Sequence, residues 1–172
     1  MRPDMPIEQL VRRNDTHFQL GFGAEARARM PESEEFALQP DKSGLLVLAR
    51  NEESLTPPVE LLREMYGPKL EVASPRVRLI RGVQVKEPIM HLRISFQAQF
   101  LDAVARAMLG RGAAPTEEYA RGRYCVLRYE APLADLLGLG GELARNTGGT
   151  AKHWVALSHY ALVTRSPGGD AA

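Results

Sequence analysis

The most regular hydrophobic pattern lies in the second half of the chain. Apolar and polar residues alternate over residues 90–96, which predicts a strand with one buried face. A helical stripe of apolar residues follows over 100–108, and Gly110 and Gly112 end it. The same two periodicities predict four more elements: a short strand within 113–122, a strand over 124–129, a helix on the leucine stripe of 133–143 and a strand within 150–163.

The first half shows a weaker pattern. The apolar run over residues 45–49 predicts a buried strand, and Thr56-Pro57-Pro58 opens a helix that Gly67-Pro68 ends. Alternation over residues 70–79 then predicts a strand or a bent pair of strands. Further towards the N-terminus, we expect a short helix from Ile7 to Val11, a strand through Phe18, Leu20 and Phe22, and a helix from Ala24 to Met30.

The order of the elements predicts an α+β fold. The second half reads β–α–β–β–α–β, the split βαβ order of a ferredoxin-like sandwich, in which two helices cover one face of an antiparallel sheet. We expect two such lobes, the N-terminal one partial or divergent. The predicted domains are residues 1–85 and 86–165, followed by a flexible tail over 166–172.

Composition narrows the function classes. Of 172 residues, 44% are hydrophobic and 25% are charged, as in ordinary globular domains. A net charge of +1 excludes attachment to nucleic acid by bulk charge alone, although a local basic face remains open. One cysteine excludes an internal disulfide and any multi-cysteine zinc site. The chain has no apolar signal core and no membrane-length apolar run, so we expect a cytoplasmic protein without membrane contact.

No group of residues predicts catalysis, a metal or a cofactor. His153 and His159 lie six residues apart on one strand, which puts them on one face but about 20 Å apart, too far to share a metal. Cys125 stands inside an alternating run, where a thiol packs as a small apolar group. The loose G-x-G-x-x-A at Gly21 is followed too soon by Pro31 for a dinucleotide site. Gly138 to Gly141 favour close helix–sheet packing. We therefore predict a protein that is not an enzyme.

Basic side chains near the ends of the predicted elements are the remaining candidate site. Four of the 22 basic residues are lysine and the other 18 are arginine, which suits fork-like recognition of phosphate. Cations at helix ends also arise simply because they complement the helix dipole. The candidates for contact with RNA or a protein partner are Arg106, Arg111, Arg121, Arg123, Arg145 and Lys152.

Three motifs in the second half carry a family resemblance. They are Glu87-Pro88-Ile89-Met90, the stretch A-P-L-A-D-L-L-G-L-G-G-E-L-A-R-N-T-G-G-T from Ala131, and Ser158-His159-Tyr160. In this order over residues 87–163, they resemble the C-terminal domain of elongation factor G and related translational GTPases. Residues 43–80 more faintly resemble the third domain of that family, whereas the family's T-x-G-R arginine is Thr150 here.

The resemblance implies a binding role without nucleotide chemistry. The family's GTPase domain needs G-x-x-x-x-G-K-[ST], and this chain contains no Gly-Lys dipeptide, so we expect no GTP binding. The second and fourth domains of the family have no counterpart either. The resemblance implies a translation-associated module that docks at the ribosomal factor-binding region, through rRNA or a ribosomal protein. The alternative is a module for a protein partner or small ligand that kept the fold without binding ribosomes.

Overall fold

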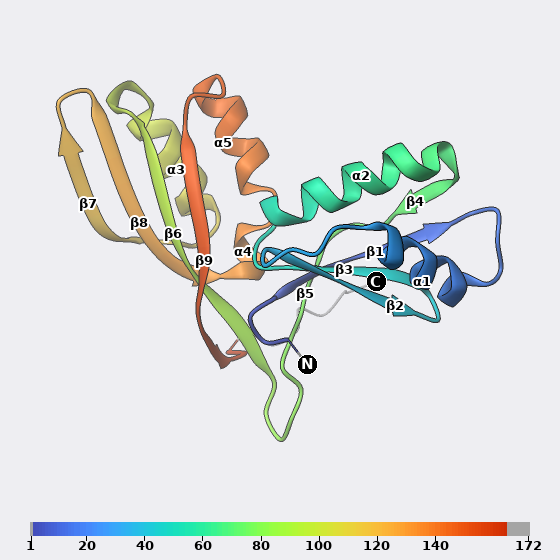
Figure 1. The fold of residues 1–172 in the computed structure, drawn as a ribbon. Helices are drawn as coiled ribbons and strands as arrows, with labels where there is room; N and C mark the ends of the chain where they lie inside the picture. The colour runs from blue at the N-terminus through green and yellow to red at the C-terminus, as the bar shows by residue number, and fades with distance from the viewer. Residues whose placement is uncertain (1, 165–172) are drawn as a thin grey trace, which may run out of the picture. The chain divides into compact units, whose positions relative to one another are not determined.

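The computed structural model describes residues 2–164, and it divides into two compact units, Met1–Arg78 and Leu79–Ala172 (Figure 1). The tail predicted over residues 166–172 lies outside the described residues. No helix in the described part of the chain is long and apolar enough to cross a membrane. Each unit contains one antiparallel sheet with its helices, which confirms the predicted α+β fold of two ferredoxin-like lobes.

The first unit has the order β–α–β–β–α–β with short additions. Its main sheet runs β2-β3-β1-β4, all antiparallel, and β5 pairs with β1. The elements are β1 (Ile7–Arg13), α1 (Gln19–Arg29), β2 (Phe36–Asp41), β3 (Gly44–Ala49), η1 (Glu53–Leu55), α2 (Thr56–Tyr66), η2 (Gly67–Lys69), β4 (Leu70–Val72) and β5 (Arg76–Val77). The bent pair predicted over residues 70–79 is therefore β4 and β5.

Two predictions for the N-terminal residues are wrong. The stretch from Ile7 to Val11 is strand β1, not a helix, because a spacing of four residues fits both periodicities and pairing with β3 buries Ile7 and Val11 together. The stretch around Leu20 starts α1 and is not a strand. Its alternation is misleading, since Phe18 and Leu20 are exposed and only Phe22 is buried.

A buried glutamine connects β1 to α1. Gln19 is 6% exposed, and its Nε2 donates hydrogen bonds to the carbonyl oxygens of Arg13 and Thr16, both at 2.7 Å. Its Oε1 accepts a hydrogen bond from the Arg13 amide at 3.1 Å. One side chain therefore forms hydrogen bonds with three backbone groups of the turn between β1 and α1.

Replacing Gln19 by alanine is expected to reduce the free energy of unfolding of the first unit by about 1–2 kcal/mol, because three backbone groups lose their partner. Urea unfolding followed by far-UV circular dichroism would measure the loss. Trp154, the single tryptophan, lies in the second unit, so its fluorescence should report an unchanged transition there. Leu20→Ala, at an exposed neighbour, is the control; equal midpoints for the two variants would contradict this role for Gln19.

The second unit repeats the same order in a cleaner form. Its sheet runs β7-β8-β6-β9, again antiparallel, with α3 and α5 beside each other on one face (Figure 1). The elements are β6 (Lys86–Gln97), η3 (Ala98–Phe100), α3 (Leu101–Gly110), β7 (Pro115–Arg121), β8 (Tyr124–Pro132), α4 (Leu133–Leu136), α5 (Leu139–Thr147) and β9 (Lys152–Leu162). This order confirms the elements that the sequence predicts for residues 90–163, except that the helix predicted over 133–143 is divided in two.

The core of the second unit lies between the sheet and its helices. On β6 the predicted alternation is present, with Met90, Leu92, Ile94 and Phe96 each no more than 1% exposed. The partner strand β8 places Cys125 opposite Phe96, and the thiol is buried as the sequence predicts. The helices contribute buried side chains from their facing stripes: Val104, Ala107, Met108, Leu133, Leu136, Leu139 and Leu143.

Two local features of the second unit differ from prediction. The leucine stripe of 133–143 forms two helices, not one, because Leu137 is extended and Gly138 adopts a left-handed conformation with φ of +76°. An added Cβ on Gly138 would meet nothing within 4 Å, so this glycine serves the turn and not close packing. In β9, a bulge at Ser158 reverses the alternation. His153 therefore pairs with core-facing Ile94, whereas His159 pairs with Ile89 on the other face.

Candidate functional site

Four of the six predicted cations lie at one end of the second sheet. The end is formed by the β7–β8 hairpin, the C-terminus of β6 and the start of β9, as the register shows: Tyr124 pairs with both Arg121 and Gln97, and Lys152 pairs with Ser95. The last turn of α5 reaches the same end. We call this group the cationic end; its members are Arg121, Arg123, Arg145 and Lys152, all exposed.

The hairpin at the cationic end is held in place by its backbone. Gly122 has φ of +61°, which allows a tight turn between Arg121 and Arg123. The amide of Ala98 then donates a 2.7 Å hydrogen bond to the carbonyl of Arg123, joining the hairpin to the end of β6. The two arginines therefore project from a fixed backbone, and among residues 2–164 neither side chain has an ion-pair partner.

The connection between α5 and β9 fixes the other two cations. Gly148 and Gly149 are left-handed, and the amide of Gly149 donates to the carbonyl of Ala144. The buried Thr147 hydroxyl donates to the Leu143 carbonyl at 2.7 Å and accepts from the Ala151 amide at 3.1 Å. This closed turn holds Arg145 and Lys152 on either side of it, and no carboxylate in the described part of the chain pairs with either.

The remaining two predicted cations lie elsewhere. Arg106 is exposed midway along α3, away from the cationic end. Arg111 follows the C-terminus of α3 and turns inward: its side chain is 18% exposed. Its Nε and one terminal nitrogen contact a Glu142 oxygen at 3.1 and 2.6 Å, and its other terminal nitrogen donates to the carbonyls of Asp135 and Leu137 at 2.8 and 2.9 Å. The structure therefore uses Arg111 to connect α3, α4 and α5.

Sequence reasoning missed a second group on the face of this sheet that the helices leave uncovered. Arg93 on β6, Arg128 on β8 and Trp154 on β9 are neighbours across the strands, and all three are exposed. They contribute to the lining of a hollow of about 660 Å³. The signal was present in the sequence, since Arg93 alternates with buried Leu92 and Ile94 and must face away from the core.

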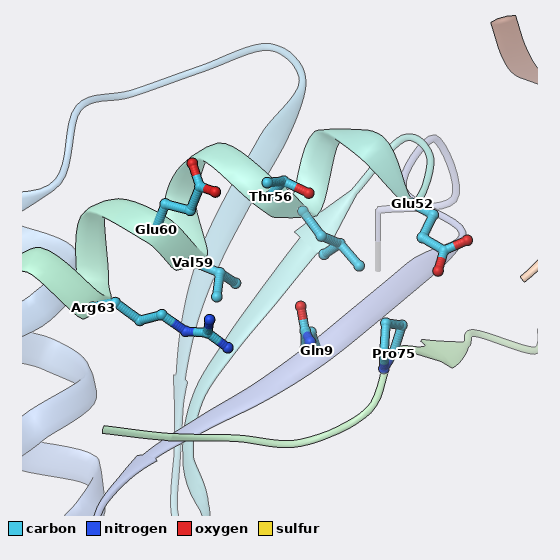
Figure 2. Close-up of a pocket in the computed structure, with 8 residues that line it drawn as sticks. Gln9, Glu52, Thr56, Val59, Glu60, Arg63 and Pro75 are labelled. Carbon is cyan, nitrogen blue, oxygen red and sulfur yellow. The ribbon is translucent and has the colours of Figure 1, made fainter. Parts of the chain in front are cut away.

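A smaller hollow lies on the first unit. It has a volume of about 230 Å³, and Figure 2 shows Val59 and Arg63 reaching from α2 towards Gln9 on β1. Gln9 Nε2 donates to the carbonyl of Ala73 at 2.8 Å, so this side chain supports the segment after β4. Glu52, Glu60 and Arg63 mix both signs of charge around the opening, which favours no ligand charge.

The chemistry of the described residues gives no catalytic arrangement. Within residues 2–164, no group of three or more His, Cys, Asp or Glu side chains could hold a metal ion. Two tyrosines have perturbed ionisation: burial, followed by the nearby Glu25, raises the pKa of Tyr66, and burial, followed by Glu118, raises the pKa of Tyr129. Both phenols therefore stay neutral near pH 7, and their packing in the cores explains the shift.

Two comparisons with known proteins point to one family. The family model described as "Elongation factor G C-terminus" matches residues 84–169, half of the chain and all four strands of the second sheet. Elongation factor G 2 from Hahella chejuensis (strain KCTC 2396) is 32% identical over 100 residues, which are 58% of this chain and 13% of that protein. The chain thus matches only a small part of the length of this relative.

Proposed function

The chain belongs to the family of the elongation factor G C-terminus, and from this membership we propose that it is a non-catalytic module that docks at the ribosomal factor-binding region. The observation that carries the proposal is the cationic end, which lies inside the matched segment. Four exposed cations from two connections, the β7–β8 hairpin and the α5–β9 turn, converge there, and each is free to contact phosphate.

The first unit supports the same proposal in a different way. Its βαββαβ order and its sheet order repeat those of the second unit. We assign it, by the fainter resemblance of residues 43–80, to a divergent relative of the family's third domain. A role at the ribosome would place the protein in the cytoplasm, and the proposal includes this location.

The net charge sets the expected strength of docking. Because the whole chain carries only +1, few phosphates can be engaged, and association should be weak and local. Each phosphate contact releases counterions, so the logarithm of the binding constant should fall linearly with the logarithm of the salt concentration.

Replacing Arg145 and Lys152 together by alanine is expected to reduce co-sedimentation with ribosomes. The slope of the logarithm of the binding constant against the logarithm of the salt concentration should become shallower by about 1–2. The melting midpoint should change little, since both side chains are exposed and only the dipole contribution of Arg145 is lost. Pelleting at a series of salt concentrations measures both quantities.

The matched control removes the same charge elsewhere. Arg27 on α1 and Arg81 are exposed, and within the described residues neither makes an ion pair. The Arg27→Ala, Arg81→Ala double variant should co-sediment like the wild type.

If the wild type pellets with ribosomes at none of the salt concentrations, the docking proposal is wrong, and binding to a protein or small-ligand partner becomes the better interpretation. Equal losses in both double variants would show that charge alone, and not the cationic end, governs association.

A further inference from the structure

The second sheet leaves one face uncovered, and that face carries an unusual set of side chains. The helices pack against the buried residues of β6, so the alternate residues of the same strand point to the opposite side. We call this side the open face and define it by Arg93, Arg128 and Trp154. A solvated sheet face ordinarily carries short polar side chains, whereas the Trp154 indole is 60% exposed.

The register brings the two arginines directly opposite each other. Arg93 on β6 pairs with Arg128 on β8, and Trp154 on β9 pairs with Arg93 from the other side. Since neighbouring strands are about 4.8 Å apart, the three side chains form one continuous row. Like charges directly opposite each other destabilise a sheet, so this pair costs the fold stability unless an anion lies above it.

Neither guanidinium is fully neutralised within the protein. Arg128 contacts Glu117 at 3.6 Å, but both side chains are more than half exposed, so this pair is weak and its arginine can exchange partners. Arg93 makes no ion pair with any described residue. Glu130, two residues from Arg128 on the same face, also lines the hollow, and its carboxylate lies 3.5 and 4.0 Å from the Nδ1 atoms of His91 and His159. Within the described residues it forms no ion pair with either arginine of the row.

The neighbouring row extends the same chemistry towards the cationic end. Tyr119 on β7 is 61% exposed and pairs with Val126, while Lys152 pairs with Ser95. In this second row Val126 and Ser95 lie between Tyr119 and Lys152. The two rows together carry exposed aromatic rings on β7 and β9 and cations on β8, β6 and β9. The hollow of about 660 Å³ over the first row is bounded by Trp154 on one side and by Thr116 and Glu117 on the other.

We propose that the open face binds single-stranded RNA, with one base stacked on Trp154 and the adjacent phosphates held by Arg93 and Arg128. Single strands are recognised by aromatic platforms for bases combined with cations for the backbone, and the open face has both in one row. A duplex hides the faces of its bases and would leave the Trp154 ring unused. The choice of RNA over DNA rests on the proposed function. The proposed stacking of a base on Trp154 does not depend on that function.

The single tryptophan allows a direct measurement. A base stacked on Trp154 should quench its fluorescence, and no other indole contributes to the signal. Titrating the full chain with a uridine oligomer of about 12 nucleotides is expected to give saturable quenching that weakens as salt is added. A duplex of the same length should quench far less, and oligo-dT serves to compare RNA with DNA.

Variants separate the two parts of the site. With labelled RNA and anisotropy, Trp154→Ala should weaken binding about tenfold or more, and Trp154→Phe should restore much of it because a ring remains for stacking. Arg93→Ala with Arg128→Ala should weaken binding and lower the salt slope by about 1–2. The Arg27→Ala, Arg81→Ala variant is the charge control and should bind like the wild type.

The outcomes distinguish this proposal from the docking proposal. No quenching by the uridine oligomer at low salt overturns the open-face proposal, even if ribosomes pellet the protein through the cationic end. Quenching by the oligomer without ribosome association supports the open face and refutes docking. Preference for the duplex, or quenching that persists undiminished in the Arg93, Arg128 variant, would also overturn the open-face proposal, because the arginine row would then contribute nothing.

Discussion

Replacing Phe96 by alanine is expected to destabilise the second unit by about 3–5 kcal/mol, among the largest effects of any single core substitution in this chain. Phe96 is 1% exposed at the C-terminal end of β6, a central strand of the sheet. Its loss removes a buried ring and leaves a cavity on the helix-covered face, and the close-packed surroundings relax only partly. For a unit of this size, the melting midpoint should fall by more than about 10 °C.

The measurement can be confined to the second unit. Trp154 fluorescence follows β9, the strand that pairs with β6, so it reports unfolding of this sheet. Leu109→Ala is the control, since Leu109 is a large apolar residue of the same unit that is 75% exposed; it should change the stability by less than about 0.5 kcal/mol. Phe96→Leu should fall between the two. Similar midpoints for Phe96→Ala and Leu109→Ala would mean that the helices do not pack on this face.

Sequence periodicity predicted the second unit well because its strands have one solvent-exposed face and one buried face. The alternation of residues 90–96 and 124–129 is unambiguous, and each strand keeps its buried residues on the helix side. In the first unit, β3 is buried on nearly every residue, and β1 places Leu10 and Gln9 at intermediate exposure, so its pattern has no clear period. The five residues from Ile7 to Val11 therefore fit a helix or a strand equally well, and only their pairing with β3 decides between the two.

The breaks in regular structure were harder to predict. The spacing of Leu133, Leu136 and Leu143 fits a continuous helix, and only the left-handed conformation of Gly138 divides it. The bulge at Ser158 leaves no mark in the composition of β9, yet it moves His159 to the face opposite His153. Both features depend on the strands and helices that surround them, which a local pattern does not contain.

Only part of the candidate site could be predicted, because a local pattern does not show which elements become neighbours. Cations at the ends of elements are visible in the sequence, but strand order decides which ends meet, and it brings Arg121, Arg123 and Lys152 together while leaving Arg106 apart. The open face requires the register as well, because Arg93 becomes the neighbour of Arg128 and Trp154 only after three strands are paired. The inward turn of Arg111 depends on Glu142, a residue 31 positions further along the chain.

Replacing Arg111 by alanine is expected to destabilise the second unit by about 2–4 kcal/mol, although the residue stands at a helix end where surface cations are common. The substitution removes a charge-assisted contact of 2.6 Å to Glu142 and leaves two carbonyls, of Asp135 and Leu137, without this donor. Glu142 is only 31% exposed, so its carboxylate loses its partner in a place that water reaches poorly.

Three comparisons identify the cause of that loss. Arg111→Lys keeps the charge but replaces a planar fork by one ammonium that cannot reach all three oxygens, so its stability should be intermediate. Glu142→Gln keeps an acceptor and should cost less than Arg111→Ala. Arg106→Ala, an exposed arginine of the same unit, should change the melting midpoint very little.

If Arg111→Ala proves as stable as Arg106→Ala while ribosome association falls, Arg111 contacts a partner, as its position in the sequence first predicts. If the midpoint falls and association at a temperature where the variant is folded stays normal, Arg111 holds α3 to α5 and belongs to the fold.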